Sequence, residues 1–198
     1  MGFLAEKTVF SPLTKDVLEK SSEFSCGNED LDGFFHHDSV SYAENLFGKS
    51  YCYYTEDKDK EREIVCAFTV SNASIFTKLL PNARKKKVSK LVPHIKQDLI
   101  YPAVLIGRLG ISVNYQHLHI GTEVINFIKS WFIEPYNKTG CRYVVVDAYN
   151  DEVPISFYKK NGFDFMFSTE VQEKAYRGIV SAMPLKTRLM FFDLILIK

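Results

Sequence analysis

An apolar strand pattern followed by a short polar turn and an amphipathic helix pattern constrains this chain most. Residues 103–113 are rich in Leu, Ile and Val, and helix-period apolar residues follow the turn as far as residue 132. The first turn of such a helix offers unpaired backbone N–H groups and a partial positive charge. The sequence therefore predicts that a phosphate or pyrophosphate binds where the strand passes into the helix.

Composition indicates an ordinary globular protein. The chain has 198 residues, 46% of them hydrophobic, and a net charge of +1, so we expect one domain over residues 1–198 with a sizeable core. The low net charge does not indicate a general nucleic-acid binder. No export signal or membrane-length apolar run is present, so no membrane contact is expected. The four cysteines are widely spaced without a CxxC pair, which favours free thiols in a cytoplasmic protein without a metal site.

The rest of the pattern predicts strands in the first half and alternating strands and helices in the second. An irregular insertion with one or two short helices is expected at about residues 75–100. The remaining predicted elements are strands over 8–13, 50–55, 64–72, 142–148, 163–167 and 187–197, helices over 15–20, after Asn28 and over 153–161, and a long loop over 171–186. This order predicts an α/β protein with a mixed sheet and helices on its faces. The last strand is apolar on both faces and could support a homodimer.

Two segments resemble signatures of the GNAT superfamily of acyl-CoA-dependent N-acyltransferases. The turn Gln116-His117-Leu118-His119-Ile120-Gly121 is similar to the pyrophosphate-binding pattern (Q/R)-x-x-G-x-(G/A). Asn150 followed by Phe157-Tyr158-Lys159-Lys160-Asn161-Gly162-Phe163 is similar to the pattern N…FY-x-x-x-G-F. The resemblance implies a GNAT-like acyltransferase fold, with a central, mostly antiparallel sheet that contains a splayed parallel pair.

Two further segments, residues 24–32 and 105–109, resemble the branch of that superfamily that contains tRNA-acetylating toxins of toxin–antitoxin pairs. Members of this branch modify the free amine of aminoacyl-tRNA, which would make tRNA and an antitoxin the partners. Their surfaces are broadly basic, and a net charge of +1 matches that poorly. Residues 84–87 form the one obvious basic cluster, and such a cluster is more often a solvated helix face.

The resemblance implies an N-acetyltransferase that transfers an acetyl group from acetyl-CoA to a primary amine by direct attack. Tyr158 would donate a proton to the departing thiolate, unless it is only a core aromatic with a satisfied hydroxyl. Asn150 would hydrogen-bond the pantetheine arm, cap the next helix, or do both. Lys159 and Lys160 would reach a CoA phosphate or be solvated. The other expected cofactor contacts are Ile111, Ser112 and Val113 beside the thioester, and Leu118, His119, Ile120, Gly121 and Thr122 at the pyrophosphate.

His119 departs from the family pattern, which has glycine at this position. Histidine there requires either an allowed backbone conformation or a displaced phosphate. Loss of catalysis, leaving an acyl-CoA-binding module, is therefore a further alternative. The general base is left open among Asp147, Glu152, Glu29 and a water chain, and the class of amine acceptor is not readable from the sequence.

Overall fold

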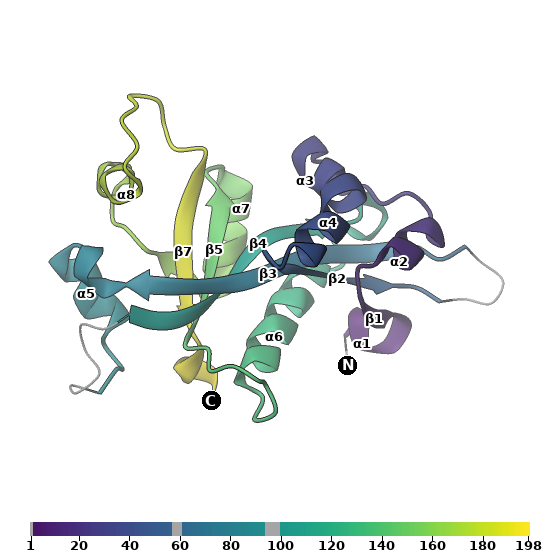
Figure 1. The fold of residues 1–198 in the computed structure, drawn as a ribbon, viewed down its shortest axis with the longest axis horizontal. Helices are drawn as coiled ribbons and strands as arrows, with labels where there is room; N and C mark the ends of the chain where they lie inside the picture. Colours follow the sequence, from purple (N-terminus) through teal and green to yellow (C-terminus); the bar gives the residue numbers. More distant parts are fainter. Residues whose placement is uncertain (1, 57–60, 94–99) are drawn as a thin grey trace. The chain divides into compact units, whose positions relative to one another are not determined.

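The computed structural model describes residues 2–56, 61–93 and 100–198 (Figure 1). Its seven strands lie in the order β1 (Val9–Pro12), β2 (Lys49–Tyr54), β3 (Ile64–Phe76), β4 (Ile100–Ile111), β5 (Tyr143–Tyr149), β7 (Thr187–Asp193) and β6 (Asp164–Phe165). The pairs β1-β2, β2-β3, β5-β7 and β6-β7 are antiparallel, whereas β4 and β5 form a parallel pair. The predicted mixed α/β fold with one parallel pair is confirmed. No helix in the described ranges is both long and apolar enough to cross a membrane.

The chain divides into two compact units, Met1–Ser71 with Ile106–Ile128 and Asn72–Leu105 with Lys129–Lys198. Each is described by itself. Strands β3 and β4 and helix α6 contribute residues to both.

The first unit begins with a helix that was not predicted, and its other elements follow the predicted order. Thr14 and Asn28 act as the helix caps, because their side-chain oxygens accept the N–H groups of Val17 and Leu31. The elements that begin in this unit are α1 (Phe3–Lys7), β1 (Val9–Pro12), α2 (Lys15–Glu19), α3 (Glu29–Gly33), the π-helical turn η1 (Phe34–Asp38), α4 (Ser39–Glu44), β2 (Lys49–Tyr54), β3 (Ile64–Phe76), the 3-10 turn η4 (Val113–Tyr115) and α6 (Ile120–Ile133).

Helices cover both faces of the strands in this unit (Figure 1). On one face, the Phe127 ring of α6 packs against Phe10 and Tyr53, with ring centroids 4.8 and 5.5 Å apart. On the other face, apolar side chains of the segment from α2 to α4 pack against four strand residues, Cys52, Tyr54, Ile64 and Ala67, in one buried cluster. Cys52 and Tyr53 are consecutive, so their side chains point to opposite faces.

The second unit has its core around the partly stacked rings of Tyr101 and Tyr143, with Phe167 and Phe191 beside them. Gly162 has φ +81° and follows the end of α7, at the point where the helix predicted over 153–161 ends. The elements of this unit are the 3-10 turn η2 (Thr77–Leu79), α5 (Asn82–Val88), the first part of β4 (Ile100–Ile111), β5 (Tyr143–Tyr149), α7 (Glu152–Lys160), β6 (Asp164–Phe165), α8 (Glu170–Arg177), β7 (Thr187–Asp193) and the 3-10 turn η5 (Leu194–Ile197). Strand β3 extends to Phe76, so the predicted insertion starts there. Its residues 94–99 lie outside the described ranges.

Two predictions for the C-terminal part are wrong. The predicted loop over residues 171–186 begins with helix α8, which Thr169 caps at its start and the left-handed Gly178 follows at its end. The predicted last strand ends at Asp193, because the side chain of Asp193 accepts the N–H of Ile195 and starts η5. Strand β7 pairs along its whole length with β5 but only at Met190 and Phe191 with β6, and its use in a homodimer stays a prediction.

Candidate functional site

The backbone of the turn before α6 adopts the conformation that glycine would supply. His117 has φ +70° and His119 has φ +58°, in the left-handed region that L-residues adopt infrequently and histidine tolerates better than most. Of the two ways to accommodate His119, the structure has the allowed left-handed backbone. Both side chains are exposed.

This turn presents a row of backbone donors. Among the described residues, none accepts a hydrogen bond from the N–H of Leu118, His119, Ile120 or Gly121. The N–H of Thr122 already donates to the carbonyl of His119, at 3.0 Å, which leaves its exposed hydroxyl for a ligand. Since α6 has 14 residues, its dipole adds a partial positive charge at the same place. The turn can therefore hold a phosphate group through backbone donors alone.

Glu123 in the first turn of α6 would oppose an anion, but its charge is already compensated. Its carboxylate accepts the backbone N–H groups of Phe3 and Leu4, at 3.0 and 2.9 Å. The unpredicted helix α1 thus places its own N-terminus on Glu123. This contact reduces the repulsion that Glu123 would exert on a phosphate.

The backbone N–H groups of the residues that follow β4 are not equally available. Ser112 donates to the carbonyl of Val65 and Val113 to that of Ser25, each at 2.9 Å. Successive N–H groups of an extended chain point to opposite sides, so the N–H of Ile111 points away from β3. Of the three residues expected beside the thioester, Ile111 is therefore the one whose N–H is not committed to Val65 or Ser25.

In the second unit, Tyr158 of α7 is half-buried and its hydroxyl has no protein partner among the described residues. Its ring packs on Phe157 and Phe163, with centroids 5.1 and 5.4 Å away. In the described ranges, no group hydrogen-bonds its hydroxyl, and burial raises the pKa of Tyr158. The phenol therefore stays protonated at neutral pH and has a proton to donate. This hydroxyl is therefore available to a ligand, and the role of Tyr158 as proton donor stays a prediction.

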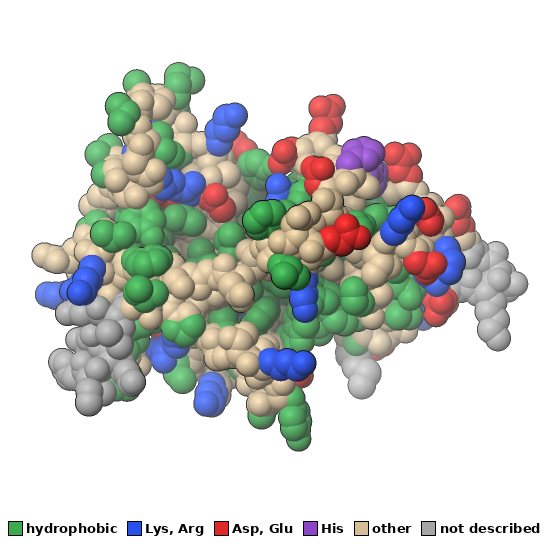
Figure 2. All heavy atoms as spheres, in the orientation of Figure 1, with side chains coloured by type: hydrophobic (Ala, Val, Ile, Leu, Met, Phe, Trp, Pro, Cys, Tyr) green, Lys and Arg blue, Asp and Glu red, His purple; other side chains and the backbone are tan. Residues whose placement is uncertain are grey.

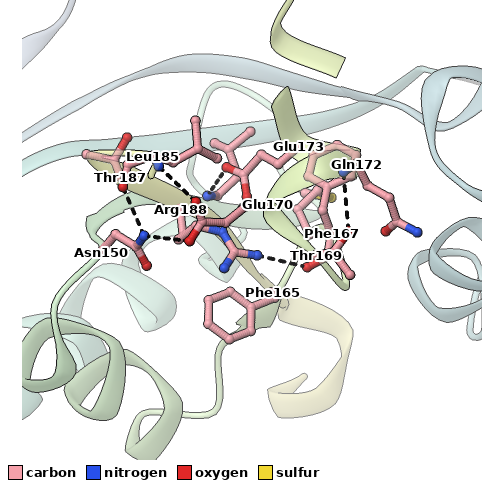
Figure 3. A network of polar contacts seen from close by, with 12 residues as sticks. Asn150, Phe165, Phe167, Thr169, Glu170, Gln172, Glu173, Leu185, Thr187 and Arg188 are labelled. Atoms are coloured by element: carbon pink, nitrogen blue, oxygen red, sulfur yellow. Dashed lines mark hydrogen bonds and ion pairs between the residues drawn. The ribbon is translucent and has the colours of Figure 1, made fainter. Parts of the chain in front are cut away.

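Asn150 is held by α8, as Figure 3 shows. Its amide nitrogen donates to Glu170 Oε1 and to the carbonyl of Leu185, each at 2.9 Å. Both amide hydrogens are therefore committed, which fixes the amide and leaves Oδ1 as an acceptor. Asp151 occupies the N-cap of α7, so the interpretation of Asn150 as the cap of that helix is wrong. Glu170 was missed because α8 was predicted as a loop.

A buried charge network lies next to these residues. Glu173 is fully buried and accepts from Arg177 at 2.6 Å, from Arg188 at 2.8 Å and from the N–H of Leu189 at 2.7 Å. Arg177 also binds Asp147, at 2.7 Å. Because Asp147 is occupied in this way, it is a weak candidate for the general base. In the described ranges, no group of three or more His, Cys, Asp or Glu side chains could hold a metal ion.

Half of the basic cluster at residues 84–87 is committed to packing. The Arg84 side chain donates to the carbonyls of Phe165 and Met166, and both Arg84 and Lys87 pair with Asp164. These contacts join α5 to β6 and leave less free basic surface than the sequence indicates. Lys159 and Lys160 are exposed, and either could contact a phosphate.

Lys129 of α6 is a buried lysine that was not predicted from the sequence. It is 7% exposed, donates to the carbonyl of Asn161 at 2.6 Å and lies 3.7 Å from the centroid of the Phe192 ring. Burial lowers its pKa from 10.5 to about 8. The contact ties α6 to the end of α7, which carries Tyr158.

We expect the stability of the protein to rise with pH between about 8 and 10.5, the folded and unfolded pKa values of Lys129. In this range the unfolded chain binds the proton and the folded chain releases it, so raising the pH favours folding by up to about 3 kcal/mol. Urea unfolding of the protein and of Lys129→Met at several pH values isolates this contribution. The exposed Lys15→Met is the control. A parallel pH dependence in all three proteins would contradict the prediction.

No family model matches the chain, and no curated protein sequence is significantly similar to it. Solved structures share its fold. AtaT complexed with acetyl-methionyl-tRNAfMet is 21% identical, with a TM-score of 0.64 and 96% of both chains covered. A tyrosine-to-phenylalanine mutant of KacT is 17% identical, with a TM-score of 0.63 and 96% of both chains covered. AtaTR bound with acetyl-CoA is 18% identical, with a TM-score of 0.58, and the match covers 96% of this chain and 95% of that one. The GNAT-like fold predicted from the resemblance is confirmed.

Proposed function

We propose that this protein is an N-acetyltransferase that transfers the acetyl group of acetyl-CoA to a primary amine by direct attack. The observation that carries the proposal is the left-handed turn at His119, where the N–H groups of residues 118–121, at the start of α6, have no acceptor among the described residues. The turn suits the pyrophosphate of CoA, and a structural neighbour of the same fold was solved with acetyl-CoA bound.

In this reaction the amine nitrogen attacks the thioester carbonyl carbon while the N–H of Ile111 stabilises the negative charge on the carbonyl oxygen. The C–S bond then breaks, and the CoA sulfur takes the proton of the Tyr158 hydroxyl. The proton that the amine loses passes to solvent, and solvent returns one to the tyrosinate. Tyr158 is the general acid and ends each cycle protonated.

The remaining residues bind the cofactor. Leu118, His119, Ile120 and Gly121 hold the pyrophosphate through their N–H groups, and Thr122 adds its hydroxyl. Asn150 accepts a pantetheine N–H through Oδ1, since its amide hydrogens are bound to Glu170 and Leu185. Ser112 and Val113 line the thioester end without donating their N–H groups. Lys159 contributes a positive charge to a CoA phosphate.

Titration calorimetry with acetyl-CoA, followed by an assay of free CoA thiol over a library of amines, tests the proposal. We expect binding to acetyl-CoA and thiol release that depends on the amine. If acetyl-CoA does not bind, the proposal fails, together with every alternative that uses this cofactor. If it binds but no amine or aminoacyl-tRNA promotes thiol release, the protein is an acyl-CoA-binding module.

A second candidate is the acetylation of aminoacyl-tRNA by a toxin that an antitoxin controls. Two observations favour it: the neighbour AtaT was solved with acetyl-methionyl-tRNAfMet and, as a mutant toxin, with the C-terminus of the antitoxin AtaR and acetyl-CoA. The pairing of Arg84 and Lys87 with Asp164, which reduces the free basic surface at residues 84–87, argues against it. Acetylation of aminoacyl-tRNA in preference to free amino acids would favour the toxin function over acetylation of a small primary amine.

His119 allows a direct test of the turn. We expect His119→Gly to retain acetyl-CoA affinity, because glycine adopts φ +58° without strain. His119→Val should weaken binding by about tenfold, because a β-branched residue is strained at positive φ. Calorimetry with acetyl-CoA measures both variants. An equal loss in the two would mean that the histidine side chain, and not the backbone conformation, binds the cofactor.

A further inference from the structure

Arg108, near the end of β4 in the first unit, differs from every other arginine of this chain. Within the described ranges it makes no ion pair and no hydrogen bond, and its Nε atom is buried without a partner. The other five arginines all pair with carboxylates: Arg62 with Glu56, Arg84 with Asp164, Arg142 with Asp193, Arg177 with Asp147 and Glu173, and Arg188 with Glu173. A half-buried guanidinium without an anion is costly unless a ligand supplies the anion.

The guanidinium is held in place by stacking. Its central carbon lies 3.7 Å from the centroid of the Phe34 ring. Phe34 is the first residue of the π-helical turn η1, and such turns are rare and frequently occur at functional sites. Stacking on a ring fixes the plane of an arginine but uses none of its N–H donors. Arg108 therefore presents an oriented set of donors that matches a carboxylate or a phosphate.

Arg108 does not face the helix that is proposed to hold the pyrophosphate. Gly110, two residues further along β4, lies on the same face as Arg108, and a Cβ on it would be 3.1 Å from the sulfur of Cys26 and 3.3 Å from the Phe24 ring. Phe24 and Phe34 belong to the apolar cluster on the face opposite α6. An anion bound by Arg108 would therefore lie at a different site from the pyrophosphate.

The acidic segment around Arg108 limits the negative charge that a ligand at this site can carry. Residues 29–44 contain five carboxylates and no lysine or arginine, and acidic side chains gather over α3 and α4 in Figure 2. Such a surface repels a polyanion and attracts a cationic amine. Arg108 is a single cationic group beside this acidic surface and can bind one oxyanion. The combination fits a small molecule that carries one ammonium group and one oxyanion.

We propose that Arg108 binds the carboxylate or phosphate of a small zwitterionic amine, which is the acetyl acceptor. The role of this amine as acetyl acceptor rests on the proposed acetyltransferase function, whereas anion binding at Arg108 does not depend on it. Paired amines distinguish a carboxylate from a phosphate as the bound oxyanion.

The anion site is tested by NMR of the arginine Nε–H groups in the full chain. Inorganic phosphate or acetate is added to the protein saturated with CoA, which occupies the pyrophosphate site. One arginine signal should shift saturably in the wild type, and that signal should be missing in Arg108→Gln. Arg62→Gln is the matched control, because Arg62 also stacks on a ring, that of Tyr54 at 4.2 Å, but is paired with Glu56. If neither anion shifts an Arg108 signal, the proposal is overturned.

The acceptor role is tested by kinetics with paired amines. An amino acid is compared with its amide, and phosphoethanolamine with ethanolamine. We expect Arg108→Gln to raise KM for the anionic member of one pair by about 10- to 100-fold, with KM for acetyl-CoA and the rates with neutral amines unchanged. The affected pair tells whether the oxyanion is a carboxylate or a phosphate. Arg62→Gln should change none of these values.

Three outcomes would contradict the acceptor role of Arg108. An equal loss with anionic and neutral amines would make Arg108 structural. A raised KM for acetyl-CoA would assign it to the cofactor. Acetylation of aminoacyl-tRNA alone, with no small amine accepted, would exclude the small acceptor. A protein that binds phosphate at Arg108 but does not bind acetyl-CoA would retain the anion site and lose the proposed function, so the two failures are distinguishable.

Discussion

Replacing Tyr158 by phenylalanine is expected to lower kcat by about 100-fold or more, with the affinity for acetyl-CoA nearly unchanged. The change removes only the hydroxyl, and no described group hydrogen-bonds that hydroxyl, so the fold loses no contact. The CoA thiolate then has to leave without a proton from the enzyme. Steady-state kinetics and calorimetry with acetyl-CoA separate the two effects.

The matched control is Tyr176→Phe. Tyr176 of α8 is also partly buried, packs its ring on Phe167 with centroids 4.8 Å apart, and has a pKa raised by burial. Its replacement should leave kcat unchanged. The raised pKa of Tyr158 has a further consequence, because the acid form persists as the pH rises. The loss of this acid should therefore not lower kcat between about pH 7 and 9. Equal rates in Tyr158→Phe and the wild type would remove Tyr158 from the mechanism.

Short-range signals in the sequence predicted the fold well. Side chains that cap a helix act within three residues, so the helix starts after Thr14 and Asn28 could be predicted without knowledge of the tertiary structure. The end of α7 is a short-range signal as well, because Gly162 follows it at φ +81°. The strand, turn and helix around residues 103–132 were also recognisable, because their apolar periods change from strand to helix at the turn.

Helix α8 could not be predicted in this way because its buried face is charged. Glu173 is fully buried, whereas the apolar Val171 is 76% exposed, so hydrophobic periodicity gives the opposite of the true orientation. The carboxylate of Glu173 is tolerated inside because Arg177 and Arg188 surround it. That contact joins α8 to β7, and only the folded chain brings these residues together. The same long-range packing explains why Glu170, the partner of Asn150, was missed.

Replacing Glu173 by leucine is expected to destabilise the protein by about 3–5 kcal/mol, the largest effect on stability expected here. The change leaves Arg188, which is 8% exposed, without its carboxylate, and frees the N–H of Leu189 that donates to Glu173 at 2.7 Å. Urea unfolding measures the loss. The control is Glu19→Ala, since Glu19 forms an exposed ion pair with Lys15 at 3.5 Å and should change stability by at most about 1 kcal/mol.

A double substitution separates the cost of an unpaired charge from the value of the ion pair. Removing one member of a buried pair leaves a desolvated charge, whereas removing both leaves none. Glu173→Leu combined with Arg188→Met should therefore be more stable than Glu173→Leu alone, although it restores no salt bridge. Arg177 retains Asp147 at 2.7 Å in either variant, so it does not become a second unpaired charge. A double variant that is less stable than Glu173→Leu would show that the unpaired charge of Arg188 does not cause the loss of stability. The loss would then come from the packing of α8 on β7.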